Sequence, residues 1–370
     1  MILSICVPVF GTQCFFQALL ESIKEAIKTC INNIDSFTLD GASRVSLSPL
    51  ISLFGQCKEK IGSYIFELIV VDDGSEIKSD KKLLYKICKE YKKEFESSYF
   101  TKLTLIEHSK NLGLLEARRS AVMESSGKWI MFVDSDDELP SNAILHLLCN
   151  AEIYNASIVQ GKGKVVKDAD DDTLFLQGYK KDKIEALEKK VQKVHVGFMN
   201  RGKTNDIMRS FLIKESHNGF LWGKIFLADV CKKAFMEIPQ SFCVMGEDFL
   251  IYFFILLHAS SYLGIEEEVY KYYLGRGISN NAEIKDLRRW EAAITAGAVF
   301  TIIFDYLEEH PMQDDIVDAI MNIASFHVLS NVKHFRRVAP EIKDEAYALM
   351  KSYWSCNMIE DAESYYKNNL

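Results

Sequence analysis

The feature that most constrains this sequence is an alternation of short apolar runs and helix-like stretches within residues 1–137. The apolar runs lie at 2–9, 66–71, 103–107 and 128–133, and β-branched residues are frequent in them. After each run comes a stretch whose apolar residues recur at helical spacing. Strands that alternate with helices in this way predict an α/β fold, in which helices cover both faces of a mostly parallel sheet.

Two segments depart from this regular pattern, one within residues 1–137 and one after it. Residues 36–64 are rich in serine and separate the first two strands by more than a normal crossover, so we interpret them as an insertion. Residues 161–218 are less periodic, and 162–167 and 173–179 are predicted to form a hairpin around the acidic run 168–172. Five consecutive acidic or small residues cannot all converge on one ion, which favours a solvated turn over a metal site.

The last third of the chain is predicted to be helical. Apolar residues recur at helical intervals at 292–307, 316–332 and 342–353, with polar faces between them. Packing of these helices against the rest of the chain explains the pattern best. A homodimer contact, a cover over an acceptor groove and a contact with a membrane remain open alternatives.

Charge and cysteine usage limit the partners of the chain. The 370 residues carry a net charge of -8, so nucleic acid is not an expected partner. Nine scattered cysteines without a C-x-x-C pair are typical of reduced thiols and predict a cytoplasmic protein. The apolar stretches 249–257 and 292–304 are shorter than the roughly 20 residues of a spanning helix, so no transmembrane segment is expected. Lysine patches leave open a peripheral association with the inner face of the cell membrane.

A cluster of acidic residues directly follows the strand at 128–133. Asp134, Asp136 and Asp137 stand there with Ser135 between them. Carboxylates crowded at a strand end repel one another, and a bound Mg²⁺ or Mn²⁺ would compensate their charge. The alternative is that they cap the next helix, but one cap explains one aspartate and not three.

Two further acidic pairs stand at the ends of predicted elements. Asp72 and Asp73 precede Gly74 at the end of the strand 66–71, where they suit either a nucleotide site or an Asx turn. Glu247 and Asp248 stand before an apolar helix, where a carboxylate can serve as a general base. An acidic first helical turn would use the same residues.

These acidic groups, in this order, resemble those of glycosyltransferase family 2. Four other segments strengthen the resemblance, namely Val7-Pro8-Val9, Asn111-Leu112-Gly113 with Arg118 and Arg119, Trp222-Gly223-Lys224, and Tyr270 through Gly277-Ile278-Ser279. The resemblance implies a GT-A fold, which is a Rossmann-like sheet with helices on both faces, over residues 1–280. Within it, about 1–140 would bind the nucleotide sugar and about 141–280 would form the acceptor side. Residues 281–370 would form a C-terminal helical domain.

The resemblance also implies a role for each matching residue. Asp248 would be the general base and Glu247 its support on the acceptor side, Asp136 would hold Mn²⁺ or Mg²⁺, and Asp134 would lie near the ribose and the metal. The donor side would be formed by Pro8, Val9, Asp72, Asp73, Asn111, Arg118, Ser135 and Arg276, and the acceptor side by Trp222 and Lys224. One aspartate of the 72–73 pair would read the base edge, and Arg118 would reach the donor nucleotide or its phosphates.

The expected activity is the inverting transfer of one sugar from a nucleotide-diphosphate sugar, with UDP favoured. The acceptor would be a hydroxyl of a bacterial surface glycan or of a lipid-linked saccharide. Processive synthases carry a Gln-x-x-Arg-Trp motif, whereas Asp286 replaces the glutamine here, which favours single-sugar transfer. A nucleotidyltransferase is the main alternative, but residues 10–13 contain no basic residue that could form its phosphate loop. The second alternative is a catalytically silent protein that binds a sugar nucleotide.

Overall fold

A computed structural model describes residues 1–37, 47–59, 64–168, 180–276 and 283–368 of the protein. The predicted hairpin strand 173–179, most of the acidic run 168–172 and the motif residues 277–279 lie outside these ranges. Within them, residues 162–167 belong to one long strand. The segment 36–64 contains a helix of its own, at Ser48–Glu59.

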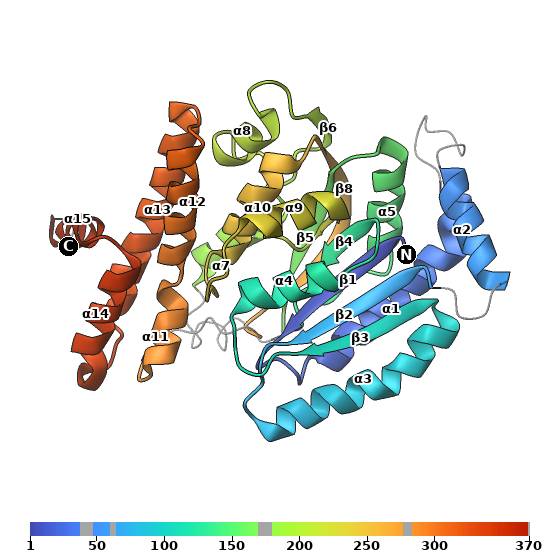
Figure 1. Ribbon diagram of the computed structural model, residues 1–370, viewed down its shortest axis with the longest axis horizontal. Helices are drawn as coiled ribbons and strands as arrows, with labels where there is room; N and C mark the ends of the chain where they lie inside the picture. Colours follow the sequence, from blue (N-terminus) through green and yellow to red (C-terminus); the bar gives the residue numbers. More distant parts are fainter. Residues whose placement is uncertain (38–46, 60–63, 169–179, 277–282, 369–370) are drawn as a thin grey trace.

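An eight-stranded sheet forms the centre of the molecule (Figure 1). Its strand order is β3-β2-β1-β4-β7-β5-β8-β6. β1 pairs in parallel with β2 and β4, β2 with β3, and β5 with β8, whereas β7 and β6 run antiparallel to their neighbours. The predicted mostly parallel sheet is therefore confirmed. The strands are β1 (Leu3–Val9), β2 (Phe66–Asp72), β3 (Thr101–Glu107), β4 (Trp129–Phe132), β5 (Ile158–Lys167), β6 (Gly197–Asn200), β7 (Lys224–Leu227) and β8 (Ser261–Leu274).

Helices cover both faces of this sheet, as the sequence predicts. Side chains alternate along β1, so that Ile5 and Val7 pack with α1, α3 and α5, while Cys6 packs on the opposite side with α4, α9 and α10. Figure 1 shows α4, α9 and α10 together on the near side of the sheet. The helices of this part are α1 (Phe16–Asn33), η1 (Ile34–Ser36), α2 (Ser48–Glu59), α3 (Lys78–Ser98), α4 (Leu114–Glu124), α5 (Ala143–Tyr154), α7 (Lys181–Val191), α8 (Asp206–Leu212), α9 (Ala228–Glu237) and α10 (Glu247–His258).

The C-terminal third is helical and lies to one side of the sheet (Figure 1). Its apolar residues belong to the same hydrophobic core as α4, α9 and α10, so it packs directly on the sheet-containing part. Gly246, at the start of α10, faces Ala296 and Val299 of α12. The helices are α11 (Leu287–Ile294), α12 (Ala296–Glu309), α13 (Asp314–Phe335), η3 (Pro340–Ile342), α14 (Lys343–Tyr353) and α15 (Cys356–Asn368).

One helical stretch is longer and more apolar than the sequence analysis expected. Leu287–Glu309, which joins α11 and α12, has the length and hydropathy of a membrane-crossing helix. Trp290, Ile294, Val299 and Phe300 from this stretch are buried in the protein core. Core helices of globular proteins pass the same test, so this finding is weak evidence for a membrane span.

Candidate active site

The loops that follow β1, β2 and β4 meet at one edge of the sheet. Parallel strands bring their carboxyl ends together, which is where ligands bind in open α/β sheets. Thr12, after β1, hydrogen-bonds through its hydroxyl to the Ser135 hydroxyl after β4, with 2.6 Å between the oxygens. Gln13 donates to the Ser75 hydroxyl after β2, also at 2.6 Å. Neither Thr12 nor Gln13 is singled out by the sequence, because a single hydroxyl or amide carries no periodic signal.

Asp73 holds the next loop in place. Its carboxylate accepts hydrogen bonds from the backbone N–H groups of Leu112 (2.9 Å) and Gly113 (3.0 Å). The imidazole of His108 bonds to the same carboxylate at 2.7 Å and to the Ser120 hydroxyl at 2.8 Å. Both oxygens of Asp73 are thus used within the protein. Asp73, which is expected to line the nucleoside pocket, therefore also organises the start of α4.

Asp72 is the second member of that pair. It is buried, and its Oδ1 accepts the N–H of Ser75 at 3.0 Å, which closes the turn after β2. Pro8 and Val9 end the neighbouring strand β1, with Val9 opposite Asp72 in the parallel register. Asn111 accepts the N–H of Gly113 through its side chain at 3.1 Å. These four residues therefore border the same loop cluster at the sheet edge.

Arg118 of α4 joins the acidic groups of two distant parts of the chain. Its Nη1 donates to Glu247 and to Asp248, each at 2.7 Å, and its Nη2 donates to Asp134 at 2.9 Å. Two of the three acidic clusters recognised in the sequence thus lie around one guanidinium. Arg118 was expected to reach the donor phosphates, and here the structure differs, since the side chain is only 1% exposed and bonds to carboxylates.

Burial and mutual repulsion set the protonation of these acids. Burial, and then the charge of Asp248, raise the pKa of Glu247 well above its ordinary value, although Arg118 opposes this shift. Burial also raises the pKa of Asp134. Burial alone would lower the pKa of Arg118, but the three acids outweigh it and raise that pKa instead. Burial and the nearby acids thus favour the protonated form of Glu247 and the charged form of Arg118.

Asp136 is the acid of the 134–137 loop that the protein leaves without a partner. Among the described residues, no side chain donates a hydrogen bond to its carboxylate, whereas Asp137 accepts from the Tyr270 hydroxyl (2.8 Å) and from the Tyr273 N–H (2.7 Å). Burial and the charge of Asp134 raise the pKa of Asp136 to about 6. A half-buried carboxylate that no side chain of the described residues neutralises is a natural ligand for a hard divalent cation.

The surroundings of Asp136 suit a divalent cation that takes its other ligands from substrate phosphates. In the part of the chain that the structure describes, no group of three or more acidic, histidine or cysteine side chains is placed to hold a metal. Mg²⁺ and related ions need only one or two protein carboxylates when substrate phosphates supply the other oxygens. Arg276 lies beside this loop, where its Nη1 donates to the backbone carbonyl of Asp136 at 3.2 Å and its guanidinium stacks on Tyr273.

The predicted acceptor-side residues Trp222 and Lys224 are both buried. Trp222 is 4% exposed and lies between the rings of Phe220 and Tyr270, each with its centroid 4.4 Å away, so both faces are covered. Lys224 is fully buried, and its ammonium donates to Asn218 at 2.8 Å and to the carbonyl of Phe220. Both side chains are thus enclosed by neighbouring residues of the protein. They support the stack of aromatic rings that ends at Tyr270.

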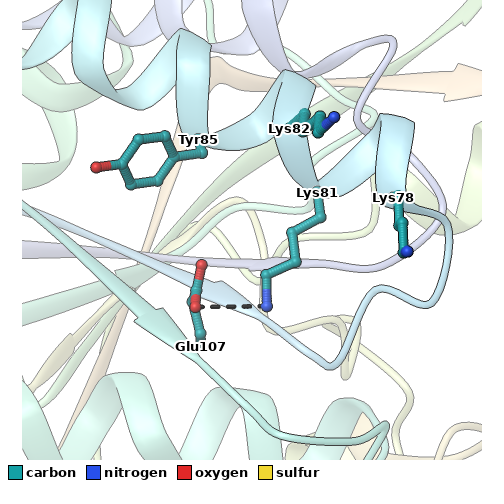
Figure 2. Close-up of a pocket in the computed structure, with 5 residues that line it drawn as sticks. All are labelled: Lys78, Lys81, Lys82, Tyr85 and Glu107. Atoms are coloured by element: carbon teal, nitrogen blue, oxygen red, sulfur yellow. Dashed lines mark ion pairs between the residues drawn. The ribbon is translucent and has the colours of Figure 1, made fainter.

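A separate surface pocket lies outside this cluster (Figure 2). It is lined by Lys78, Lys81, Lys82 and Tyr85 of α3 and by Glu107 of β3. Lys81 pairs with Glu107 at 3.4 Å, which is the dashed contact in Figure 2. The pocket shares no residue with the acidic cluster around Arg118.

Comparison with known proteins gives the class and then the family. The sheet with helices on both faces and the acidic cluster at its edge define a glycosyltransferase with a GT-A fold. The fold is shared with residues 1–349 of TarS from S. aureus, with a TM-score of 0.50 and 14% identity, over 100% of this chain and 92% of that chain. The sequence profile described as glycosyl transferase family 2 matches residues 4–207. The chain belongs to glycosyltransferase family 2.

Two curated relatives carry names that agree with this assignment. An uncharacterised glycosyltransferase of Rickettsia bellii is 43% identical over 72 residues, which are 20% of this chain and 9% of the relative. Glycosyltransferase GlyA of Streptococcus pneumoniae is 26% identical over 211 residues, which are 57% of this chain and 27% of the relative. The matches thus span about a quarter or less of these relatives' length. Family membership decides against the nucleotidyltransferase alternative.

Proposed function

We propose that the protein transfers a single sugar, with inversion, from a UDP-sugar to a hydroxyl of a saccharide or lipid-linked saccharide acceptor. The observation that carries this proposal is the cluster around Arg118. Asp134 and Asp248 both accept hydrogen bonds from this guanidinium. Asp134 belongs to the same loop as the metal-binding candidate Asp136, and Asp248 is the candidate base. A donor phosphate and an acceptor hydroxyl bound on either side of this cluster would have the acid and base groups that the reaction needs.

In the proposed reaction, the acceptor oxygen attacks the anomeric carbon from the face opposite the diphosphate. Asp248 takes the proton of the acceptor hydroxyl as the new C–O bond forms. The bond between the anomeric carbon and the phosphate oxygen breaks in the same step, and the electron pair leaves with the diphosphate. Glu247, which stands in the same first turn of α10 and accepts from the same Nη1 of Arg118, supports Asp248 in this role.

A divalent ion, Mn²⁺ or Mg²⁺, would be held by Asp136 with Asp134 beside it. When bound, such an ion neutralises the charge that grows on the leaving diphosphate. Arg276 lies on the same side and would contact a phosphate. The nucleoside side of the donor pocket would be formed by Pro8, Val9, Asp72, Asn111 and Ser135. Asp72 would hydrogen-bond to the edge of the base.

The choice of UDP rests on a neighbour of the same fold. The TarS structure with a TM-score of 0.50 contains UDP-GlcNAc. Incubation with UDP, GDP, CDP and dTDP sugars and Mn²⁺ should release UDP in preference to the other nucleoside diphosphates. Release that favours GDP or dTDP would overturn the choice of donor, and no release with any acceptor or with water would overturn the transferase proposal.

A further inference from the structure

Arg118 is a buried charged side chain that forms ion pairs with three acids. It stands on α4, is 1% exposed and bonds to Glu247, Asp248 and Asp134. These partners come from the helix after residue 246 and from the loop after β4. No other guanidinium within the described ranges shows bonds to three acidic side chains.

Stability alone does not explain this arrangement. A buried ion pair is often no more stabilising than apolar side chains of similar volume, since removing charges from water is costly. The neighbouring helical residue Arg119 satisfies itself in a simpler way. It pairs with Glu116 on its own helix at 2.9 Å and donates to the carbonyls of Phe235 and Pro239. The ion pairs of Arg118 therefore suggest a function at the acidic groups that it joins.

The geometry of a guanidinium fixes the groups that it binds. Its planar, rigid set of donors holds carboxylates at set directions and distances, which a lysine ammonium does not do. Here Nη1 lies 2.7 Å from Asp248, and Nη2 of the same group lies 2.9 Å from Asp134. The candidate base and the acidic loop are thereby held at a constant separation.

A direct contact between Arg118 and the donor is difficult in this arrangement. Both Nη atoms already donate to acids. Nε is buried and, within the described residues, has no hydrogen-bond partner. Three of the five N–H donors of the guanidinium are thus used by carboxylates, and at 1% exposure the side chain offers a phosphate almost no accessible surface.

We propose that Arg118 is a positioning residue, which fixes the Asp248 carboxylate relative to the acidic loop at Asp134, and that it does not bind the donor. The inference rests on the proposed function, because it takes Asp248 as the base. A misplacement of about 1 Å at a reacting group can cost about a hundredfold in rate. Loss of Arg118 should therefore lower kcat and leave donor affinity nearly intact.

The test compares Arg118→Lys and Arg118→Met with the control Arg119→Lys. For Arg118→Lys, kcat should fall about a hundredfold, while donor KM and the Kd of UDP with Mn²⁺ stay within about threefold. Arg118→Met should lose more activity than Arg118→Lys, because a lysine keeps one charge for one carboxylate. Arg119→Lys should leave kcat unchanged. Circular dichroism and thermal unfolding establish that each variant is folded, and Arg118→Lys decides the test if Arg118→Met does not fold.

The opposite pattern would overturn the inference. A donor KM or a UDP Kd that rises in proportion to the loss of activity, with kcat preserved, would make Arg118 a donor-binding residue. An equal loss of kcat in Arg119→Lys would show a general effect on α4. If the wild-type protein turns over none of the sugar nucleotides, the proposed function fails and this inference fails with it, whereas an active wild type leaves the variants to decide the inference alone.

Discussion

At the scale of single residues, side-chain exposure separates the roles of Glu247 and Asp248. The two side chains share the Nη1 of Arg118, yet burial favours a proton on Glu247. Asp248, 27% exposed at its side chain against 7% for Glu247, is better placed to meet an acceptor.

Replacement of Asp248 by asparagine tests the base. Asparagine keeps the size of the side chain but cannot accept the proton, so turnover should fall by about 10²- to 10⁴-fold. The thermal shift caused by UDP with Mn²⁺ should remain as in the wild type. Asp305→Asn, at an exposed position of α12, is the matched control. Full activity in Asp248→Asn would remove Asp248 from the role of base.

Replacement of Asp136 by alanine tests the metal site. The wild-type protein should bind UDP more tightly with Mn²⁺ than without it, and EDTA should remove the difference. In Asp136→Ala this gain should disappear, because the carboxylate that completes the ion's coordination is lost. Calorimetric titration of UDP with and without Mn²⁺ measures the gain. An unchanged gain in the variant would place the metal elsewhere.

At the scale of elements, the proposed donor side depends on close packing between the loops after β2 and β3, where Gly74 meets Lys110 and Asn111. Gly74 has a φ of +71°, and a Cβ there would lie 2.1 Å from the carbonyl carbon of Lys110 and 2.3 Å from the nitrogen of Asn111. Only glycine fits, since both the conformation and the contact exclude a side chain. The sequence Asp72-Asp73-Gly74 thus serves the packing of two loops.

Gly74→Ala should weaken both the fold and the donor site. We expect a loss of about 2 kcal/mol or more in the free energy of unfolding, from strain and from the displaced backbone at 110–111. Gly55→Ala is the control, because this glycine lies in helix α2 with nothing within 4 Å of its would-be Cβ. Alanine there should stabilise the helix by about 0.5–1 kcal/mol. Equal stability of the two variants in urea unfolding would contradict the packing argument.

Much of the fold and part of the site could be predicted from the sequence. The predicted bounds of β1, β2 and β3 agree with the structure to within two residues. In β1 and β2 the signal is a nearly continuous apolar run, because these strands are buried on both faces, whereas β3 is only partly buried. The strands β6 and β7 have four residues each and were missed, since so short a run shows no periodicity. Helix α15 lies within the predicted helical region 281–370, although its own bounds were not predicted.

The directions of individual side chains could not be predicted. Arg118 and Arg119 are adjacent and identical in type, and only the rotation of α4 about its axis decides which one enters the cleft. The ring of Trp222 was expected to be free for an acceptor, but Phe220 precedes it by two residues and Tyr270 arrives from β8, which no local pattern reveals.

At the scale of the whole molecule, the C-terminal helices and the sheet share one hydrophobic core. His327 of α13 lies in this region against the rings of Phe300 and Phe326, with centroid distances of 5.4 and 5.8 Å. Burial, and then the charge of Lys190, lower its pKa from 6.5 to about 4. Since Lys190 belongs to α7, the two parts of the molecule influence each other electrostatically.

The stability of the protein should therefore depend on pH through His327. The unfolded chain binds a proton near pH 6.5, while the folded protein does not until about pH 4, so acid favours unfolding between these values. Each pH unit in this window should cost about 1.4 kcal/mol from this residue. His327→Phe, which preserves the ring contacts, should flatten the decline of the unfolding free energy between pH 6.5 and 5. Parallel slopes for the two proteins would refute the contribution of His327.

The central claim, an inverting transfer with Asp248 as base, is tested most directly by the configuration of the product. The wild-type protein, an α-linked UDP-sugar, Mn²⁺ and an acceptor saccharide should give a β-linked product, whose anomeric proton identifies the linkage by NMR. At the same donor occupancy, Asp248→Asn should form this product at least about a hundredfold more slowly. An α-linked product, or a β-linked product formed at the wild-type rate by Asp248→Asn, would contradict the account.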